Sequence, residues 1–176
     1  MSSRPSADRY SRPAIFFHWA IFLLIALAYL AIEIRGPKGS ESRVLWTAVH
    51  LWAGSLVLTL AVLRVLWRLW RPAPPEIETN AILGFLARLV HLALYMFIFV
   101  QPLLGMLMLN TGGHPVTLAG LNLNIVLVGA DPVARPVIKS LHVLIGNAFY
   151  FVIGLHALAA IGHAVIFRDR TLQRML

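Results

Sequence analysis

Apolar residues dominate this chain in four long runs, with polar residues gathered between them. The runs cover residues 13–33, 44–65, 86–109 and 138–167. The first three have about the 20 residues that an α-helix needs to cross a hydrocarbon core of about 30 Å. The fourth is longer, so its helix must tilt or project beyond the core. The pattern predicts an all-α fold, an integral membrane four-helix bundle that forms a single domain over residues 1–176.

Composition supports the assignment to the lipid bilayer. The chain has 59% hydrophobic and only 12% charged residues, with a mean hydropathy of +0.78. Soluble proteins contain about twice that share of charged residues. Four spans leave no room for a soluble domain in 176 residues, so any chemistry is expected inside the bundle.

The basic residues predict an orientation, because cytoplasmic connections are enriched in Lys and Arg. Ten lie in the two tails and around the connection between the second and third runs, and five lie on the other side. We therefore expect both termini in the cytoplasm. The net charge of +8 is distributed around the spans, which indicates membrane topology and no nucleic-acid binding. The ten are Arg4, Arg9, Arg12, Arg64, Arg68, Arg71, Arg88, Arg168, Arg170 and Arg174, and the five are Arg35, Lys38, Arg43, Arg135 and Lys139.

One alternative concerns the first run. A basic tail, an apolar stretch and the small-residue pattern at residues 26–28 also resemble a cleavable signal peptide. Cleavage there would remove His18 from the mature protein.

The candidate chemistry lies in the histidines. The chain has no cysteine and seven histidines, most of them inside the apolar runs. The lack of cysteine excludes disulfides, thiolate nucleophiles, cysteine-ligated iron–sulfur clusters and covalently attached c-type haem. Ionisable side chains inside a membrane are costly and usually mark function.

Depth in the membrane predicts two histidine pairs. His18 lies near the inner start of the first helix, and His50 near the outer start of the second. The fourth helix carries His142 near its outer start and His156 fourteen residues later, about 21 Å deeper. At about 100° per residue, these two side chains differ by only about 40° around the helix axis. We therefore expect His50 to face His142 on the outer side, and His18 to face His156 on the inner side.

Two facing imidazoles can hold a haem iron from above and below, whereas zinc favours three or four ligands. Gly54 and Gly146 each follow an outer histidine by four residues, on the same helix face. A glycine there leaves space for a flat macrocycle, so both are expected to pack against haem. The alternative is that each histidine only hydrogen-bonds a neighbouring helix.

The residues resemble those of the bacterial cytochrome b561 family over nearly the full chain. The matching stretches are residues 15–19, which contain the Phe-His-Trp sequence of His18, and residues 34–36, 48–50, 139–142 and 150–157. The last is similar to members that oxidise superoxide at the outer surface and pass the electron to ubiquinone. The resemblance implies a bacterial inner-membrane protein with two haems b, ligated at His18, His50, His142 and His156.

Several assignments stay open at this stage. His163 is expected to line a quinone pocket, or else to lie at the membrane interface. His91 could support the inner haem or a quinone, or hydrogen-bond another helix. The electron donor could be superoxide, drawn by the outer basic residues, or a periplasmic redox protein. Two further alternatives are a cytochrome subunit of a larger complex and a histidine-bearing transporter or zinc-binding membrane protein without haem.

Overall fold

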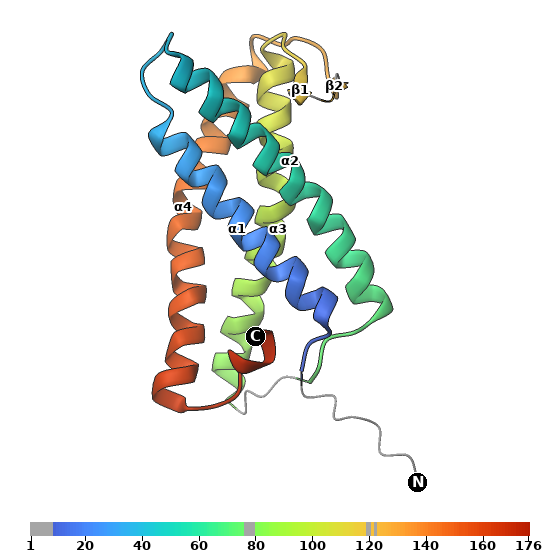
Figure 1. Ribbon diagram of the computed structural model, residues 1–176, viewed down its shortest axis with the longest axis vertical. Helices are drawn as coiled ribbons and strands as arrows, with labels where there is room; N and C mark the ends of the chain where they lie inside the picture. The colour runs from blue at the N-terminus through green and yellow to red at the C-terminus, as the bar shows by residue number, and fades with distance from the viewer. Residues whose placement is uncertain (1–8, 76–79, 119–120, 122) are drawn as a thin grey trace.

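The computed structural model describes residues 9–75, 80–118, 121 and 123–176, and it is mostly helical (Figure 1). Four long helices, α1 (Arg12–Ile34), α2 (Glu41–Trp70), α3 (Ala81–Thr111) and α4 (Ala134–Gly162), form the body of the protein. Between α3 and α4 lie two short strands, β1 (Val116–Leu118) and β2 (Leu123–Ile125). A π-helical turn, η1 (His163–Phe167), continues α4, and a short 3-10 helix, η2 (Gln173–Met175), follows it.

Local sequence signals set the helix ends. Ser40 and Asn80 precede α2 and α3, and their side-chain oxygens accept hydrogen bonds from backbone N–H groups of the first turn. Asp131 does the same for the start of α4. The turn between α1 and α2 contains Gly36 and Gly39, both with positive φ, a conformation that glycine adopts without steric cost. These signals set the starts of α2, α3 and α4, and they allow a short turn between α1 and α2.

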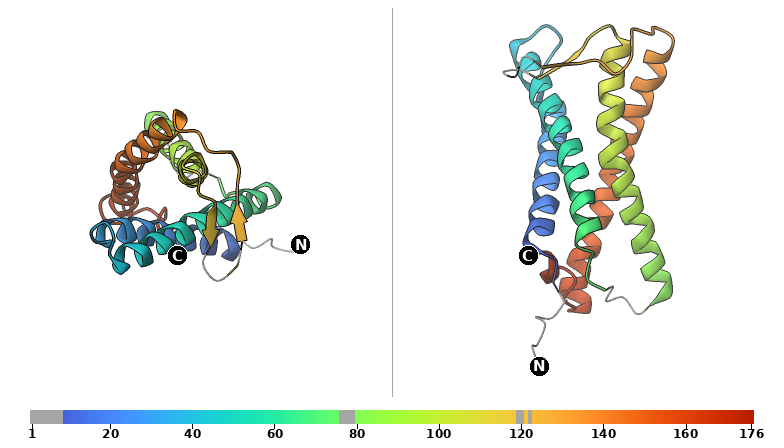
Figure 2. Two further views of the ribbon diagram at one scale, coloured as in Figure 1. Left: turned by 90° about the horizontal axis from the view of Figure 1, so that it is seen from above. Right: turned by 90° about the vertical axis from the view of Figure 1, so that its right-hand side faces the viewer.

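The helices associate as two hairpins. The α1 helix packs along α2 and α3 packs along α4, while α2 and α3 make a smaller contact. Figure 2 shows the first hairpin on one side of the molecule and the second on the other. In the described part of the chain, the backbones of α1 and α4 make few close approaches. Side chains, and not closely packed backbones, therefore occupy the space between α1 and α4.

The outer surface of the bundle is apolar. All four helices are long and apolar enough to cross a membrane, and at most 17% of the residues in their most apolar windows are buried inside the protein. Large side chains such as Phe151, which is 82% exposed, point outward. Such a surface is stable only against lipid. The predicted four-helix membrane fold is confirmed, and the helices extend beyond the predicted spans by a few residues at several ends.

The two-stranded sheet was not predicted. The antiparallel strands β1 and β2 lie in the connection from α3 to α4, and Val116 and Leu118 pack on Met106 beside α2 and α3. The side chain of Asn110, only 2% exposed, holds this connection in place. Its Nδ2 donates to the carbonyls of His114 and Ile125, and its Oδ1 accepts from Leu127 N.

Replacement of Asn110 by alanine is expected to lower the free energy of unfolding by about 1–3 kcal/mol, because three partly buried backbone groups lose their side-chain partner. Unfolding in detergent by increasing SDS, followed by circular dichroism, measures this loss. Asn124 provides the control. It is an exposed strand residue, and among the described contacts its side chain hydrogen-bonds only Thr117. Its replacement by alanine should lower the free energy of unfolding much less. Equal stability of the two variants would contradict the role of Asn110.

The two ends of the described chain meet at one end of the bundle. Tyr10 N donates to Arg174 O, and the Arg9 side chain donates to the carbonyl of Leu176. Trp19 Nε1 also donates to Met175 O. We call this end the termini end, and the opposite end, which carries β1 and β2, the loop end (Figure 1). Arg4, counted in the orientation analysis, lies outside the described residues.

Candidate functional site

The first histidine pair lies toward the loop end, between the hairpins. His50 of α2 and His142 of α4 have ring centres 6.2 Å apart, with the ring planes nearly perpendicular at 87°. A metal held between two imidazoles needs nitrogen–metal bonds of about 2 Å on each side. Adding about 1 Å from each nitrogen to its ring centre gives about 6 Å between centres. The observed spacing therefore suits one metal ion held axially by this pair.

Backbone carbonyls orient both rings of this pair. His50 Nδ1 lies 2.9 Å from Ala28 O, and His142 Nδ1 lies 3.2 Å from Gln101 O. A carbonyl only accepts, so both Nδ1 atoms must donate. Each Nε2 then keeps its lone pair, which is the state that a metal ligand needs.

A hollow of about 470 Å³, counting its open mouth, adjoins these two rings. Gly54 lines it, and a Cβ atom added at Gly54 would meet nothing within 4 Å. Most of the lining is apolar, which suits a macrocycle. The residues around the hollow are Ile25, Ala28, Tyr29, His50, Gly54, Val57, Phe97, Ile98, Gln101, Pro102 and His142.

The other predicted packing glycine lies differently. A Cβ atom at Gly146 would come within 3.0 Å of Gln101 Nε2, and Gly146 O accepts from the Tyr29 hydroxyl. Gln101 Nε2 donates to His142 O, whereas its buried Oε1 has no partner among the described residues. Buried polar atoms are nearly always paired, so the protein alone does not complete this wall of the hollow.

The second pair lies toward the termini end. His18 of α1 and His156 of α4 also have ring centres 6.2 Å apart, at 72° between planes. His91 of α3 lies closer to His156, at 5.3 Å between ring centres. That spacing is shorter than a metal between two imidazoles requires. Geometry therefore favours His18 over His91 as the partner of His156.

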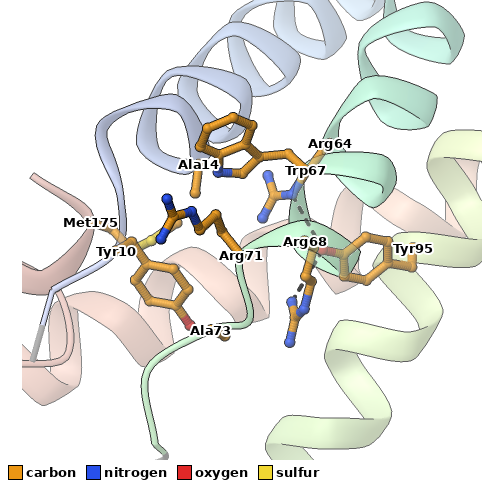
Figure 3. A pocket seen from close by; sticks show the side chains of 9 residues that line it. All are labelled: Tyr10, Ala14, Arg64, Trp67, Arg68, Arg71, Ala73, Tyr95 and Met175. Carbon is orange, nitrogen blue, oxygen red and sulfur yellow. Dashed lines mark hydrogen bonds between the residues drawn. The ribbon is translucent and has the colours of Figure 1, made fainter. Parts of the chain in front are cut away.

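The termini-end pair has a cationic neighbour. Arg64 Nη1 lies 3.3 Å from His18 Nδ1. Arg64 Nε and Arg68 Nη1 both donate to the hydroxyl of Tyr95. Arg64, Arg68 and Tyr95 line an open hollow of about 320 Å³, shown in Figure 3.

An aromatic contact lies midway between the two pairs. Phe97 of α3 and Phe149 of α4 stack with ring centres 4.2 Å apart. Phe149 is seven residues from His142 and seven from His156. Phe97 belongs to a buried cluster with Ile21 and Val57, so the space between the two pairs is closed by packed apolar side chains.

His163 lies at the start of η1, beyond the end of α4, and lines neither hollow. Its Nδ1 lies 2.5 Å from Asp169 Oδ2. Partial burial opposes ionisation of Asp169, but hydrogen bonds from His163 and Thr171 outweigh it and lower the pKa of this carboxyl group. The contact supplies a paired imidazole and carboxylate at the termini end.

The donor set does not suit zinc or a broken-helix transporter. Among the described residues, no group of three histidines or acidic residues is placed to hold a metal ion, whereas zinc takes three or four protein ligands. Pro102 lies inside α3, and the helix continues through it to Thr111. Transporter sites typically use helices that are interrupted at the midplane.

Three contributors to the sites were not identified in the sequence. A Cβ atom at Gly105 would come within 3.2 Å of the His142 ring, so glycine at this position makes room for that imidazole. The sequence predicts no role for Gln101, and it predicts Arg64 only as one of the basic residues that set the orientation. The glycine was the one local signal that could have been followed.

A four-helix membrane bundle with two pairs of facing histidines between its hairpins has the architecture of a membrane cytochrome b. Comparison with known proteins agrees. The family model for prokaryotic cytochrome b561 matches residues 9–176, and the chain belongs to this family. It is therefore a multi-pass bacterial membrane cytochrome that binds haem b and functions in electron transfer.

The relatives are similar along almost their entire length. Cytochrome b561 homolog 1 of Escherichia coli K12 is 33% identical over 177 residues, covering 96% of this chain and 97% of the relative. The probable superoxide oxidase CybB of Yersinia pestis is 32% identical over 172 residues, covering 96% of each chain. Cytochrome b561 homolog 2 of Escherichia coli K12 is 28% identical over 182 residues, covering 100% of this chain and 95% of the relative.

Proposed function

We propose that this protein carries electrons through two haems b in the bacterial inner membrane, from a periplasmic donor to the quinone pool. His50 and His142 would ligate the outer haem, and His18 and His156 the inner haem. The observation that carries the proposal is the equal 6.2 Å spacing of the two pairs across the gap between the hairpins. Bound haem supplies one-electron redox chemistry, while the protein supplies ligation, position and electrostatics.

The orientation follows from the charges. The termini end carries most of the basic residues, so we assign it to the cytoplasm by the positive-inside rule. The His18–His156 pair then lies on the cytoplasmic side and the His50–His142 pair on the periplasmic side.

Superoxide is the donor that the relationship to the Yersinia protein supports. In that reaction superoxide loses one electron and becomes O₂. Two such electrons and two protons convert a quinone such as ubiquinone to the quinol. We assign proton supply to His163, because the Asp169 carboxylate that accepts from its Nδ1 holds the ring in place at the cytoplasmic end. His91, beside His156, would contribute to the inner-haem environment.

The decisive experiment counts haem in the purified chain. Absorption spectra before and after dithionite reduction, with haem extracted and related to polypeptide, are expected to show two low-spin haems b per chain. A colourless protein would contradict the proposal. Co-purification of a redox protein in fixed stoichiometry would instead favour the alternative of a cytochrome subunit.

Salt dependence tests superoxide as the donor. Cationic side chains at the loop end attract a small anion and raise its encounter rate, and salt screens this attraction. We expect the rate constant for haem reduction by superoxide to fall several-fold between low ionic strength and about 0.15 M. Stopped-flow absorbance with superoxide generated in situ measures it, with a neutral one-electron reductant as the control. A rate that does not change with salt would exclude electrostatic steering of superoxide.

A further inference from the structure

Arg64 lies on α2, where this helix passes the termini-end histidine His18. Its side chain is half-buried, and its guanidinium contacts both His18 Nδ1 and the Tyr95 hydroxyl at 3.3 Å. Arg68 donates to the same hydroxyl at 3.1 Å. The guanidinium carbons of both arginines also lie within 6 Å of the Tyr95 ring centre, at 5.6 Å and 5.7 Å. Figure 3 shows these three side chains converging from α2 and α3.

The contact between Arg64 and His18 is incompatible with ligation of iron by His18 Nε2. A guanidinium only donates, so Nδ1 of His18 accepts in this contact and its ring proton lies on Nε2. A neutral histidine that binds a metal through Nε2 carries its proton on Nδ1. Two donors would then face each other. Arg64 must therefore move to a different acceptor when the site is loaded.

No described carboxylate contacts the Arg64 guanidinium. Among the described residues, no carboxylate pairs with Arg64, Arg68 or Arg71. The Tyr95 hydroxyl already receives two donors. A half-buried guanidinium is stabilised by a carboxylate, which it binds through two parallel hydrogen bonds.

We propose that Arg64, supported by Tyr95 and Arg68, binds a propionate carboxylate of the haem held between His18 and His156. Arg64 exchanges His18 Nδ1 for this carboxylate as the haem enters, which frees His18 to take the tautomer that ligates iron. This inference rests on the proposed function, because it requires haem at the termini-end pair. It assigns Arg64 as a positioning residue and as a source of positive charge near one of the two irons.

The charge predicts an electrochemical effect. A nearby cation favours the reduced iron, which carries one positive charge fewer, and it compensates the propionate. Arg64→Gln is expected to lower the one-electron reduction equilibrium constant of one haem by about tenfold, equivalent to 59 mV. The other haem should stay within twofold. Spectroelectrochemical titration of the purified dihaem protein resolves the two waves.

Two further variants define the contribution of Arg64. Arg64→Lys keeps the charge without the planar fork, and its equilibrium constant is expected to stay within about threefold of wild type. Arg170→Gln removes an exposed cation from the same end of the protein and should move neither wave by more than twofold. Equal shifts in Arg64→Gln and Arg170→Gln would overturn the proposal, because they would show a general charge effect.

Reconstitution of wild-type and variant apoprotein with haem dimethyl ester tests the carboxylate. With both propionates esterified, no carboxylate holds the Arg64 guanidinium beside the haem, so the difference that Arg64→Gln makes should fall below twofold. A persistent tenfold difference would overturn propionate binding. A difference that instead appears only in vesicles of anionic lipid, and not of zwitterionic lipid, would assign Arg64 to a lipid phosphate and also overturn the proposal.

Haem content tests the proposed function, and the haem potentials test the assignment of Arg64. A wild-type chain with fewer than two haems contradicts the proposed function. Two low-spin haems in Arg64→Gln, with both waves in their wild-type positions, contradict only the assignment of Arg64.

Discussion

Replacement of His142 by leucine is expected to reduce the haem content of the purified protein from two per chain to one. Leucine keeps an apolar side chain of similar size in α4 but offers no lone pair to iron. His50 alone would then face the hollow, and a single axial ligand gives up one of the two bonds that the 6.2 Å spacing supports. His50→Leu should give the same result. Extracted haem per polypeptide and the low-spin absorption of the reduced protein measure the loss.

His91→Leu is the matched control, because it removes an intramembrane histidine that also lies beside His156. It should keep two haems, whereas His18→Leu should keep only one. If His91→Leu loses a haem and His18→Leu retains both, His156 pairs with His91 and the termini-end assignment is wrong. Two low-spin haems in His142→Leu would equally contradict the loop-end assignment.

Replacement of Gly54 by leucine is expected to remove the same loop-end haem while all four proposed ligands remain. A Cβ atom added at this position would meet no protein atom within 4 Å, and Gly54 lines the hollow together with His50 and His142. The apoprotein should therefore accept it without strain, and the macrocycle should be excluded. The expected result is one haem per chain with unchanged helicity, measured by haem extraction and circular dichroism.

Gly154→Leu provides the control for this variant. Gly154 is also a helical glycine with nothing within 4 Å of an added Cβ atom, but it lies two residues before His156. At about 100° per residue it faces away from that histidine. This variant should retain two haems. If Gly54→Leu also retains two, the hollow beside His50 is not the site of a macrocycle.

The sequence was sufficient for the parts of the fold that depend on one helix at a time. The length and hydropathy of each run predicted the spans, because in lipid a spanning helix must satisfy its own backbone hydrogen bonds. The relative depths of His50 and His142 follow from chain direction and the rise per residue. Their facing orientation in the structure agrees with that reasoning, while the role of these histidines as ligands stays a prediction.

Features that depend on contacts between different helices and strands could not be predicted from the sequence. The strands β1 and β2 contain three residues each, too short for a period-two pattern to identify. Asn110 holds them through bonds to residues up to 17 positions away. Gly146 shows the same limit: its spacing from His142 matches that of Gly54 from His50, yet it packs against Gln101. Only the packing of α3 against α4 distinguishes the two glycines.

One histidine of each pair, His142 and His156, lies on α4, and this has a consequence for the spacing of the two pairs. His142 and His156 lie 14 positions apart on one continuous helix, so the rise per residue of that helix sets their separation along the axis at about 21 Å. The histidines paired with them, His50 and His18, come from two different helices of the other hairpin. Any change in the packing of one hairpin on the other would therefore alter the fit at each proposed haem site without altering the distance between His142 and His156. The helix α4 alone thus sets the spacing of the two proposed haem sites, because it contributes one histidine to each.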